Sequence, residues 1–272
     1  MNIHEKYENL KNIITNYGSF AVAFSGGVDS TFLLKTAHDV LGDDVIAVTA
    51  QSCFFPEREQ NEAKIFCEKE NIIHIFCQPD VLNIDGIVQN PANRCYTCKN
   101  EIMKEIKRAV EPYNIKYIAE GTNFDDDTND RPGFQAVKEH EIKSPLKDAE
   151  LTKAEIRELS KELRLPTWDK PSFACLASRF AYGETITEKK LGMVDKTEQL
   201  LFDLGFTQYR VRIHAINGGT IARIEINPNE FAKIIEPETA NKIHTEFKKY
   251  GFKYVTLDLG GYRTGSMNET LA

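Results

Sequence analysis

The sequence contains no stretch of 18 uninterrupted apolar residues, which argues against a helix that crosses a membrane. The segment from Met1 to Lys6 lacks the basic start and apolar run of a secretory signal, so we expect a cytoplasmic protein. No internal repeat or low-complexity segment is present. With 272 residues, 41% hydrophobic and 28% charged, the composition suits one large globular domain or two smaller ones.

An excess of positive charge is also missing. The net charge of −7 argues against a large nucleic-acid footprint, because contacts with phosphates dominate the affinity for nucleic acids. The six cysteines do not suggest a disulfide framework, since disulfides are rare in the cytoplasm. We therefore expect these cysteines to be core residues, reactive thiols or metal ligands.

Strands alternate with helices in the first two thirds of the chain. Apolar runs predict buried strands, and helical periodicity with capping signals predicts the helices between them. The expected strands are 20–24, 45–49, 72–76 and 117–119, and the expected helices are 30–41, 57–69, 99–110 and one opened by a capping box at Thr152–Glu155. This order predicts an α/β fold with a doubly wound, mostly parallel sheet, which binds ligands at the carboxyl ends of its strands. In helix 57–69 we expect Ala63, Ile65, Phe66 and Cys67 to form the apolar face.

The pattern changes after about Tyr182. A second capping box, Thr185 to Glu188, predicts a helix to about Leu204, and a helix over 230–249 follows further on. Alternating strands at 209–213 and 220–226, a turn at 217–219 and a strand near 254–259 complete a smaller α+β unit. We therefore predict two domains, 1–180 and 181–272.

The segment Ser25-Gly26-Gly27-Val28-Asp29-Ser30 joins a buried strand to a helix. Its glycines permit close approach of a phosphate, and the following helix offers N–H groups and the positive end of its dipole. Asp29 would repel phosphate unless it holds Mg²⁺, and the Gly-Lys-Ser/Thr of a Walker loop is absent. We predict that this loop binds phosphate groups; the alternative is an ordinary strand-to-helix turn.

The loop resembles that of the ATP pyrophosphatases, and this resemblance implies that it binds the phosphates of ATP. Two other segments fit the adenosine-nucleotide pocket that the resemblance implies, and both lie at the same edge of the sheet, where the strands end. Thr49 and Ser52 follow the second strand, and the Gly-Thr-Asn sequence follows the fourth. The full set of predicted ATP-binding residues is Ala23, Ser25, Gly26, Gly27, Asp29, Ser30, Thr49, Ser52, Gly121, Thr122 and Asn123.

The cysteines fall into two groups. Cys95, Cys98 and Cys175 have polar and basic neighbours that favour the thiolate, and they are candidate ligands of a [4Fe–4S] cluster with one open iron. A redox pair or a chance spacing remains an alternative, and a structural zinc would need a fourth ligand. The other three, Cys53, Cys67 and Cys77, have apolar neighbours and are predicted to lie in the core.

The phosphate loop resembles the signature of the PP-loop ATP pyrophosphatases, whose fold is adenine nucleotide alpha hydrolase-like. The loop, the Cys-x-x-Cys pair, the Gly-Thr-Asn segment, the Cys175 segment and the strands 209–214 and 222–225 together resemble the LarE family over nearly the whole chain. That resemblance implies a sulfur transferase for the nickel-pincer nucleotide cofactor. Such an enzyme adenylates the carboxylates of pyridinium-3,5-biscarboxylic acid mononucleotide, releases pyrophosphate and forms thiocarboxylates. It also implies catalytic roles for Cys175 and Asp29, a sulfide or persulfide donor, and a homo-oligomer.

Arg210 and Arg212 alternate along one strand and therefore point to the same face. They could clamp a phosphate or carboxylate of the mononucleotide in bidentate fashion, and the alternative is a solvated strand surface paired with acidic side chains. The predicted substrate-binding set is Arg210, Arg212, Glu198, Glu225, Arg263 and Arg179.

One departure from the best-known LarE type concerns the source of the transferred sulfur. In that type a single cysteine, in the segment matching Cys175, gives up its own sulfur, whereas here Cys95 and Cys98 accompany it. We therefore expect Cys175 to be a cluster ligand. The rival functions are iron–sulfur-dependent tRNA 2-thiolation, an amidating synthetase, and a non-catalytic redox sensor that binds nucleotide and metal.

Overall fold

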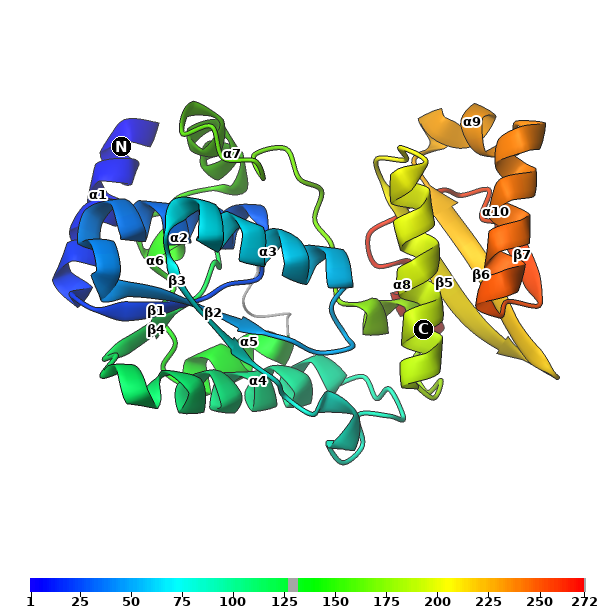
Figure 1. The fold of residues 1–272 in the computed structure, drawn as a ribbon, viewed down its shortest axis with the longest axis horizontal. Helices are drawn as coiled ribbons and strands as arrows, with labels where there is room; N and C mark the ends of the chain where they lie inside the picture. Colours follow the sequence, from blue (N-terminus) through cyan, green and yellow to red (C-terminus); the bar gives the residue numbers. More distant parts are fainter. Residues whose placement is uncertain (127–131, 272) are drawn as a thin grey trace. The chain divides into compact units, whose positions relative to one another are not determined.

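The computed structural model describes residues 1–126 and 132–271 (Figure 1). The chain divides into two compact units. The first comprises residues 1–52, 57–81 and 95–173, and the second comprises 53–56, 82–94 and 174–272. Compactness alone does not define an independent domain, so the division at residue 180 stays a prediction. Within the described ranges, no helix is both long and apolar enough to span a membrane.

The first unit is built on a four-stranded parallel sheet with strand order β3-β2-β1-β4. Its strands are β1 (Phe20–Ala23), β2 (Val45–Ala50), β3 (Ile73–Cys77) and β4 (Tyr117–Ala119). Strands β1 and β2 are almost entirely buried, which explains their uninterrupted apolar sequence. Because β1 pairs with both β2 and β4, the loops that follow these three strands meet at one edge of the sheet.

Helices cover both faces of this sheet. Figure 1 shows α2 and α3 on one face and α4 and α5 on the other, which confirms the doubly wound α/β class. The helices of this part are α1 (Ile3–Tyr17), α2 (Val28–Leu41), α3 (Glu57–Glu70), α4 (Arg94–Val110), α5 (Pro132–Glu139), α6 (Pro145–Asp148) and α7 (Lys153–Glu162).

Three details of the first unit differ from the sequence-based expectation. Helix α1 was not expected, although a capping box between Asn2 and Glu5 marks its start. Helix α4 begins at Arg94 instead of Lys99. In α3 the buried residues are Glu59, Ala63, Phe66 and Cys67, and Ile65 is 61% exposed, because it lies off the face that these four share.

The second unit contains a three-stranded sheet with the order β5-β6-β7. The strands β5 (Tyr209–Ile216) and β6 (Gly219–Ile226) form a hairpin, and β7 (Tyr254–Leu257) runs parallel to β6. Helices α8 (Glu188–Asp203) and α10 (Pro237–Tyr250) lie on one face of the sheet (Figure 1), and a short α9 (Phe231–Ile235) precedes α10. This arrangement confirms the smaller C-terminal α+β part.

Two predictions for the second unit are wrong. The helix expected over 230–249 is broken before Pro237, whose ring disfavours helical geometry in the preceding Glu236. The cap of α8 is Thr187 and not Thr185, since the Thr187 side chain accepts a hydrogen bond from the backbone N–H of Lys190 at 3.2 Å. The exposed Thr185 lies before the helix.

Replacement of Thr187 by Ala should lower the free energy of unfolding by about 1 kcal/mol, because one N–H group of the first turn of α8 loses its acceptor. Thr185→Ala, two residues away in an exposed position, should change it by less than about 0.5 kcal/mol. Urea denaturation followed by circular dichroism measures both values. Equal losses in the two variants would contradict this assignment of the cap.

Candidate functional site

The phosphate loop leaves β1 and enters α2 through two glycines. Gly26 has a φ of +70°, a conformation that favours glycine, and Gly27 is the residue that caps α2. No described side chain forms a capping hydrogen bond there, so the first N–H groups of α2 are available to a ligand. The hydroxyl of Ser30 lies 3.0 Å from that of Ser25 and donates to the carbonyl of Gly27 at 3.2 Å. The loop thus holds its shape through its own serines.

Two glycines allow neighbouring segments to press against this loop. A Cβ on Gly26 would lie 3.3 Å from both the Cβ of Ala63 and the carbonyl oxygen of Glu59 in α3. A Cβ on Gly121 would lie only 2.9 Å from the backbone nitrogen of Ser30. The Gly-Thr-Asn segment after β4 therefore touches the first turn of α2 directly through its glycine.

Asp29 carries the main electrostatic feature of the loop. Its Oδ2 accepts a hydrogen bond from Nζ of Lys153 at 2.5 Å, while its Oδ1 is buried with no hydrogen-bond partner of ordinary geometry among the described residues. Burial raises the pKa of the Asp29 carboxyl, and Lys153 and Asn123 oppose that effect. A buried carboxylate oxygen in need of a partner fits a hard cation such as Mg²⁺, which Asp29 would hold beside the phosphates.

The other predicted ATP-binding residues lie around the same edge of the sheet. Ala23 ends β1, and the hydroxyl of Thr49 near the end of β2 donates to the carbonyl of Phe24 at 2.8 Å. Ser52 follows β2, and Thr122 and Asn123 are buried after β4. The structure thus gathers these residues around the phosphate loop, and their role as ATP ligands stays a prediction.

The cysteines of the predicted cluster belong to two units. Cys95 and Cys98 lie in the first turns of α4, where the first is exposed and the second half-buried, and the half-buried Cys175 immediately precedes a short 3-10 turn, Leu176–Arg179. Within the part of the chain that the structure describes, no group of three or more His, Cys, Asp or Glu side chains is arranged to hold a metal ion. The cluster therefore stays a prediction.

The remaining cysteines were all predicted to lie in the core. Cys67 and Cys77 are buried, and burial raises the pKa of their thiols to about 12 and about 11. Cys53 is only half-buried, so the prediction is wrong for this residue.

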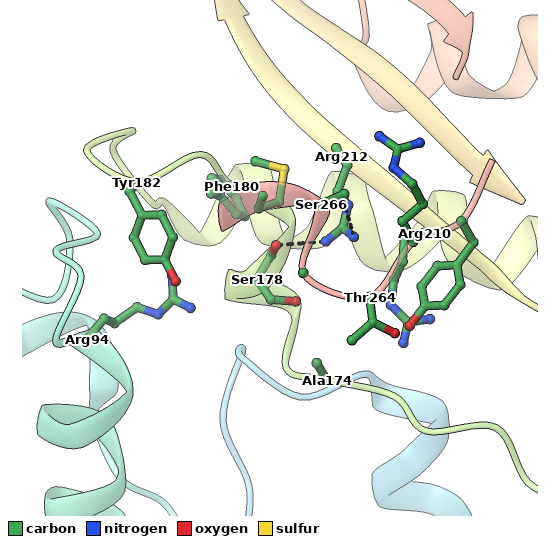
Figure 2. A pocket seen from close by; sticks show the side chains of 13 residues that line it. Arg94, Ala174, Ser178, Phe180, Tyr182, Arg210, Arg212, Thr264 and Ser266 are labelled. Atoms are coloured by element: carbon green, nitrogen blue, oxygen red, sulfur yellow. Dashed lines mark hydrogen bonds between the residues drawn. The ribbon is translucent and has the colours of Figure 1, made fainter. Parts of the chain in front are cut away.

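A cavity of about 150 Å³ opens in the second unit and is lined by several arginines (Figure 2). Arg94, Arg210, Arg212 and Arg263 reach it, together with Tyr262. Arg210 is 3% exposed and Arg212 is 5% exposed, so this face of β5 is not solvated, although Arg212 pairs with Glu225 as the alternative expected. Sequence alternation correctly placed both on one face of β5.

The two arginines of β5 differ in their charge partners. Nη2 of Arg212 lies 2.8 Å from the carboxylate of Glu225, and its Nη1 donates to the carbonyl of Ser178 at 2.9 Å (Figure 2). The guanidinium of Arg210 donates to the carbonyl of Tyr209 at 2.6 Å and lies over the ring of Tyr262. Burial lowers the pKa of Arg210, as do Arg179 and Arg212, and Glu198 offsets this only in part. Four arginines line the pocket, and a cluster of guanidinium groups of this kind suits an anionic ligand.

Arg179 and Glu198 form a buried ion pair next to the pocket, and Arg179 donates hydrogen bonds to Ala174 and Ser178, which line it. Neither Arg179 nor Glu198 is part of the lining that the described residues form, and they make a fully buried bidentate pair with distances of 2.8 and 2.7 Å. Arg179 also donates to the carbonyl of Cys175 at 3.1 Å, and Glu198 accepts from the N–H of Val211 at 2.9 Å. This pair joins the backbone of the Cys175 segment to β5.

Sequence reasoning missed two residues of the sites. Arg94 lines the pocket and donates to the carbonyl of Ala177 at 3.1 Å, but in the sequence it served only as a basic neighbour of Cys95. Lys153, the partner of Asp29, lies 124 residues from it along the chain, and no local signal links the two.

Comparison with known proteins adds to this geometry. No family model matches the chain. The protein slr1717 of Synechocystis sp. is 38% identical over 269 residues, which are 99% of each chain. The pyridinium-3,5-bisthiocarboxylic acid mononucleotide synthase of Lactiplantibacillus plantarum is 36% identical over 251 residues, 92% of this chain and 89% of that enzyme. The chain belongs to the family of this synthase, the LarE family.

The similarity to a more distant relative supports the fold class of the first unit. A glutamine-hydrolysing GMP synthase chain of Archaeoglobus fulgidus is 26% identical over 159 residues, 55% of this chain and 52% of that one. This LarE-family chain therefore combines the α/β sheet of PP-loop enzymes with the smaller C-terminal sheet that carries the arginines.

Replacement of Gly121 by Ala should lower the free energy of unfolding by about 1–3 kcal/mol, because its Cβ would displace the first turn of α2. Gly192→Ala in α8 is the matched control. No described atom outside the immediate chain lies within 4 Å of a Cβ there, and alanine should stabilise the helix by up to about 1 kcal/mol. Denaturant unfolding without nucleotide measures both changes, and a neutral Gly121→Ala would contradict the close contact.

Proposed function

We propose that this LarE-family chain is an ATP-dependent sulfur transferase that converts the carboxylates of pyridinium-3,5-biscarboxylic acid mononucleotide into thiocarboxylates. One observation carries the proposal: the same chain contains two features that suit anions. The first is a phosphate loop in which Asp29 could bind a cation, and the second is a pocket lined by arginines. The family relationship supports the choice of substrate.

The first half of the proposed reaction activates a carboxylate. An oxygen of the substrate carboxylate attacks the α-phosphorus of ATP, the bond to the β-phosphate oxygen breaks, and pyrophosphate leaves. The N–H groups at the start of α2 and the hydroxyl of Ser25 would bind the phosphates. Asp29 would hold Mg²⁺, which supplies charge neutralisation for the departing pyrophosphate.

The second half replaces AMP by sulfur. A sulfide ion, HS⁻, attacks the acyl carbon, the bond from that carbon to the AMP oxygen breaks, and AMP leaves; the thiocarboxylic acid so formed loses its proton to give the thiocarboxylate. The substrate has two carboxylates, so the sequence runs twice. The pocket arginines Arg210, Arg212 and Arg263 would hold the substrate's phosphate or its second carboxylate during both rounds.

For the sulfur source we propose a [4Fe–4S] cluster held by Cys95, Cys98 and Cys175, none of which is buried in the core. Three cysteine ligands would leave one iron open to bind sulfide. The alternative is the loss of sulfur from Cys175 itself. The two routes differ in their products, since only the second leaves dehydroalanine in the chain.

Pyrophosphate and AMP should form from ATP only when the pyridinium dicarboxylate mononucleotide is present. Arg210→Met should raise the KM for this substrate by about tenfold or more, because a charged hydrogen-bond donor is lost, while the KM for ATP stays unchanged. Arg210→Lys should recover part of the affinity through its charge. A coupled pyrophosphate assay measures these constants.

Several results would contradict the proposed function. Pyrophosphate release that depends on tRNA would favour the thiolation of RNA, and release that depends on ammonia or glutamine would favour an amidating synthetase. Binding of ATP without any release of pyrophosphate would favour a non-catalytic redox sensor.

Anaerobic reconstitution with iron and sulfide should load about four irons per chain, and Cys95→Ser, Cys98→Ser or Cys175→Ser should abolish most of this loading. Cys53→Ser, at a half-buried cysteine outside the set, should load like the wild type. Iron analysis and absorption spectra give the stoichiometry. If the chain binds no iron, and mass spectrometry shows that Cys175 loses one H₂S during turnover, the cluster is contradicted. The sulfur then comes from Cys175 itself.

A further inference from the structure

The phosphate loop contains a carboxylate and no basic residue. ATP would bring several more negative charges to this loop, and sites for phosphate generally place lysine or arginine against the phosphate oxygens. The positive charge must therefore come from other segments of the first unit. Two lysines from distant parts of the chain contact the loop, Lys153 and Lys170.

Lys170 is held in place by three acceptors. Its Nζ lies 2.6 Å from the carboxylate of Glu59, 2.7 Å from that of Glu62 and 3.0 Å from the carbonyl oxygen of Gly26. Its side chain is only 11% exposed. Two carboxylates already balance its charge, so this lysine ties the loop to α3.

Lys153 has a different environment. Among the residues that the structure describes, its Nζ contacts one carboxylate, that of Asp29, and a third of its side chain is exposed. Its backbone N–H donates to the carboxylate of Asp125 at 2.7 Å, which anchors the start of α7. The backbone of Lys153 is thus fixed beside the loop, while its long side chain can change partner by rotation alone.

We propose that Lys153 is a phosphate-binding residue of the ATP site. Without nucleotide its ammonium neutralises Asp29; with MgATP it turns from the carboxylate to an oxygen of the β- or γ-phosphate. The buried Oδ1 of Asp29, which has no hydrogen-bond partner of ordinary geometry among the described residues, supports this exchange, because the carboxylate could offer this oxygen to a metal cation as the lysine leaves. This inference rests on the proposed use of ATP.

The test compares ATP with AMP, because only ATP carries the phosphates that Lys153 would contact. We expect Lys153→Met, which keeps the length and removes the charge, to weaken the binding of MgATP by about tenfold to a hundredfold. The affinity for AMP should stay the same. Lys153→Arg should keep most of the affinity for MgATP, since the positive charge remains. Isothermal titration calorimetry of the full chain measures each dissociation constant.

Lys6→Met provides a matched control at the same end of α7. Lys6 pairs with Glu155 at 2.8 Å and donates to the carbonyl of Glu150, so its loss also removes a lysine–carboxylate contact from this helix. Its affinities for MgATP and AMP should equal those of the wild type. Thermal unfolding of each variant confirms that the chain is folded.

The possible results separate this inference from the function on which it rests. Unchanged or tighter binding of MgATP by Lys153→Met would show that the lysine only neutralises Asp29, and would overturn the inference alone. Equal losses for ATP and AMP would indicate a structural role and would also overturn it. A wild-type chain that binds no ATP would overturn the proposed function as well.

Discussion

The candidate nucleotide site depends on one close contact, that between Gly121 and the first turn of α2. The parallel pairing of β1 and β4 brings the loops after these strands together, and only a residue without a Cβ fits at the point where they touch. On the other side, α3 presses against Gly26 in the same way. The free N–H groups of α2 are thereby fixed before any ligand arrives, so that binding needs little further ordering of the loop.

In the second unit, buried ion pairs hold the groups around the pocket in place. The buried pairs Arg179–Glu198 and Arg212–Glu225 add little net stability, because taking such ions out of water costs about as much as their attraction returns. Their value is positional, since each guanidinium also binds backbone carbonyls that shape the pocket. Arg210 is also buried beside this pocket, where its guanidinium lies over the ring of Tyr262, and burial lowers its pKa.

Patterns within short segments of the sequence correctly predicted those features that depend on short segments alone. The apolar strands, the glycine loop and the alternation of Arg210 with Arg212 follow from periodicity and backbone geometry, and the structure contains all of them. The pairing of Lys153 with Asp29 joins residues 124 positions apart, and that of Lys170 with Gly26 joins residues 144 positions apart. Such contacts depend on how the helices pack around the sheet, which no spacing in the sequence reports. The errors at Ile65 and Thr185 are different, because they concern local details: Ile65 lies off the buried face of α3, and the side chain that caps α8 is that of Thr187.

The two proposed anion sites would use different cations, and the proposed reaction gives a physical reason. If both carboxylates of one substrate are activated in succession, pyrophosphate leaves twice for each mononucleotide converted, and the mononucleotide must be held in place during each activation. A lysine ammonium on a long, partly exposed side chain forms contacts that are easily exchanged, which suits a departing group. Planar guanidinium groups held by buried carboxylates and carbonyls, as in Arg212, keep a fixed geometry and suit the part of the substrate that must stay in place.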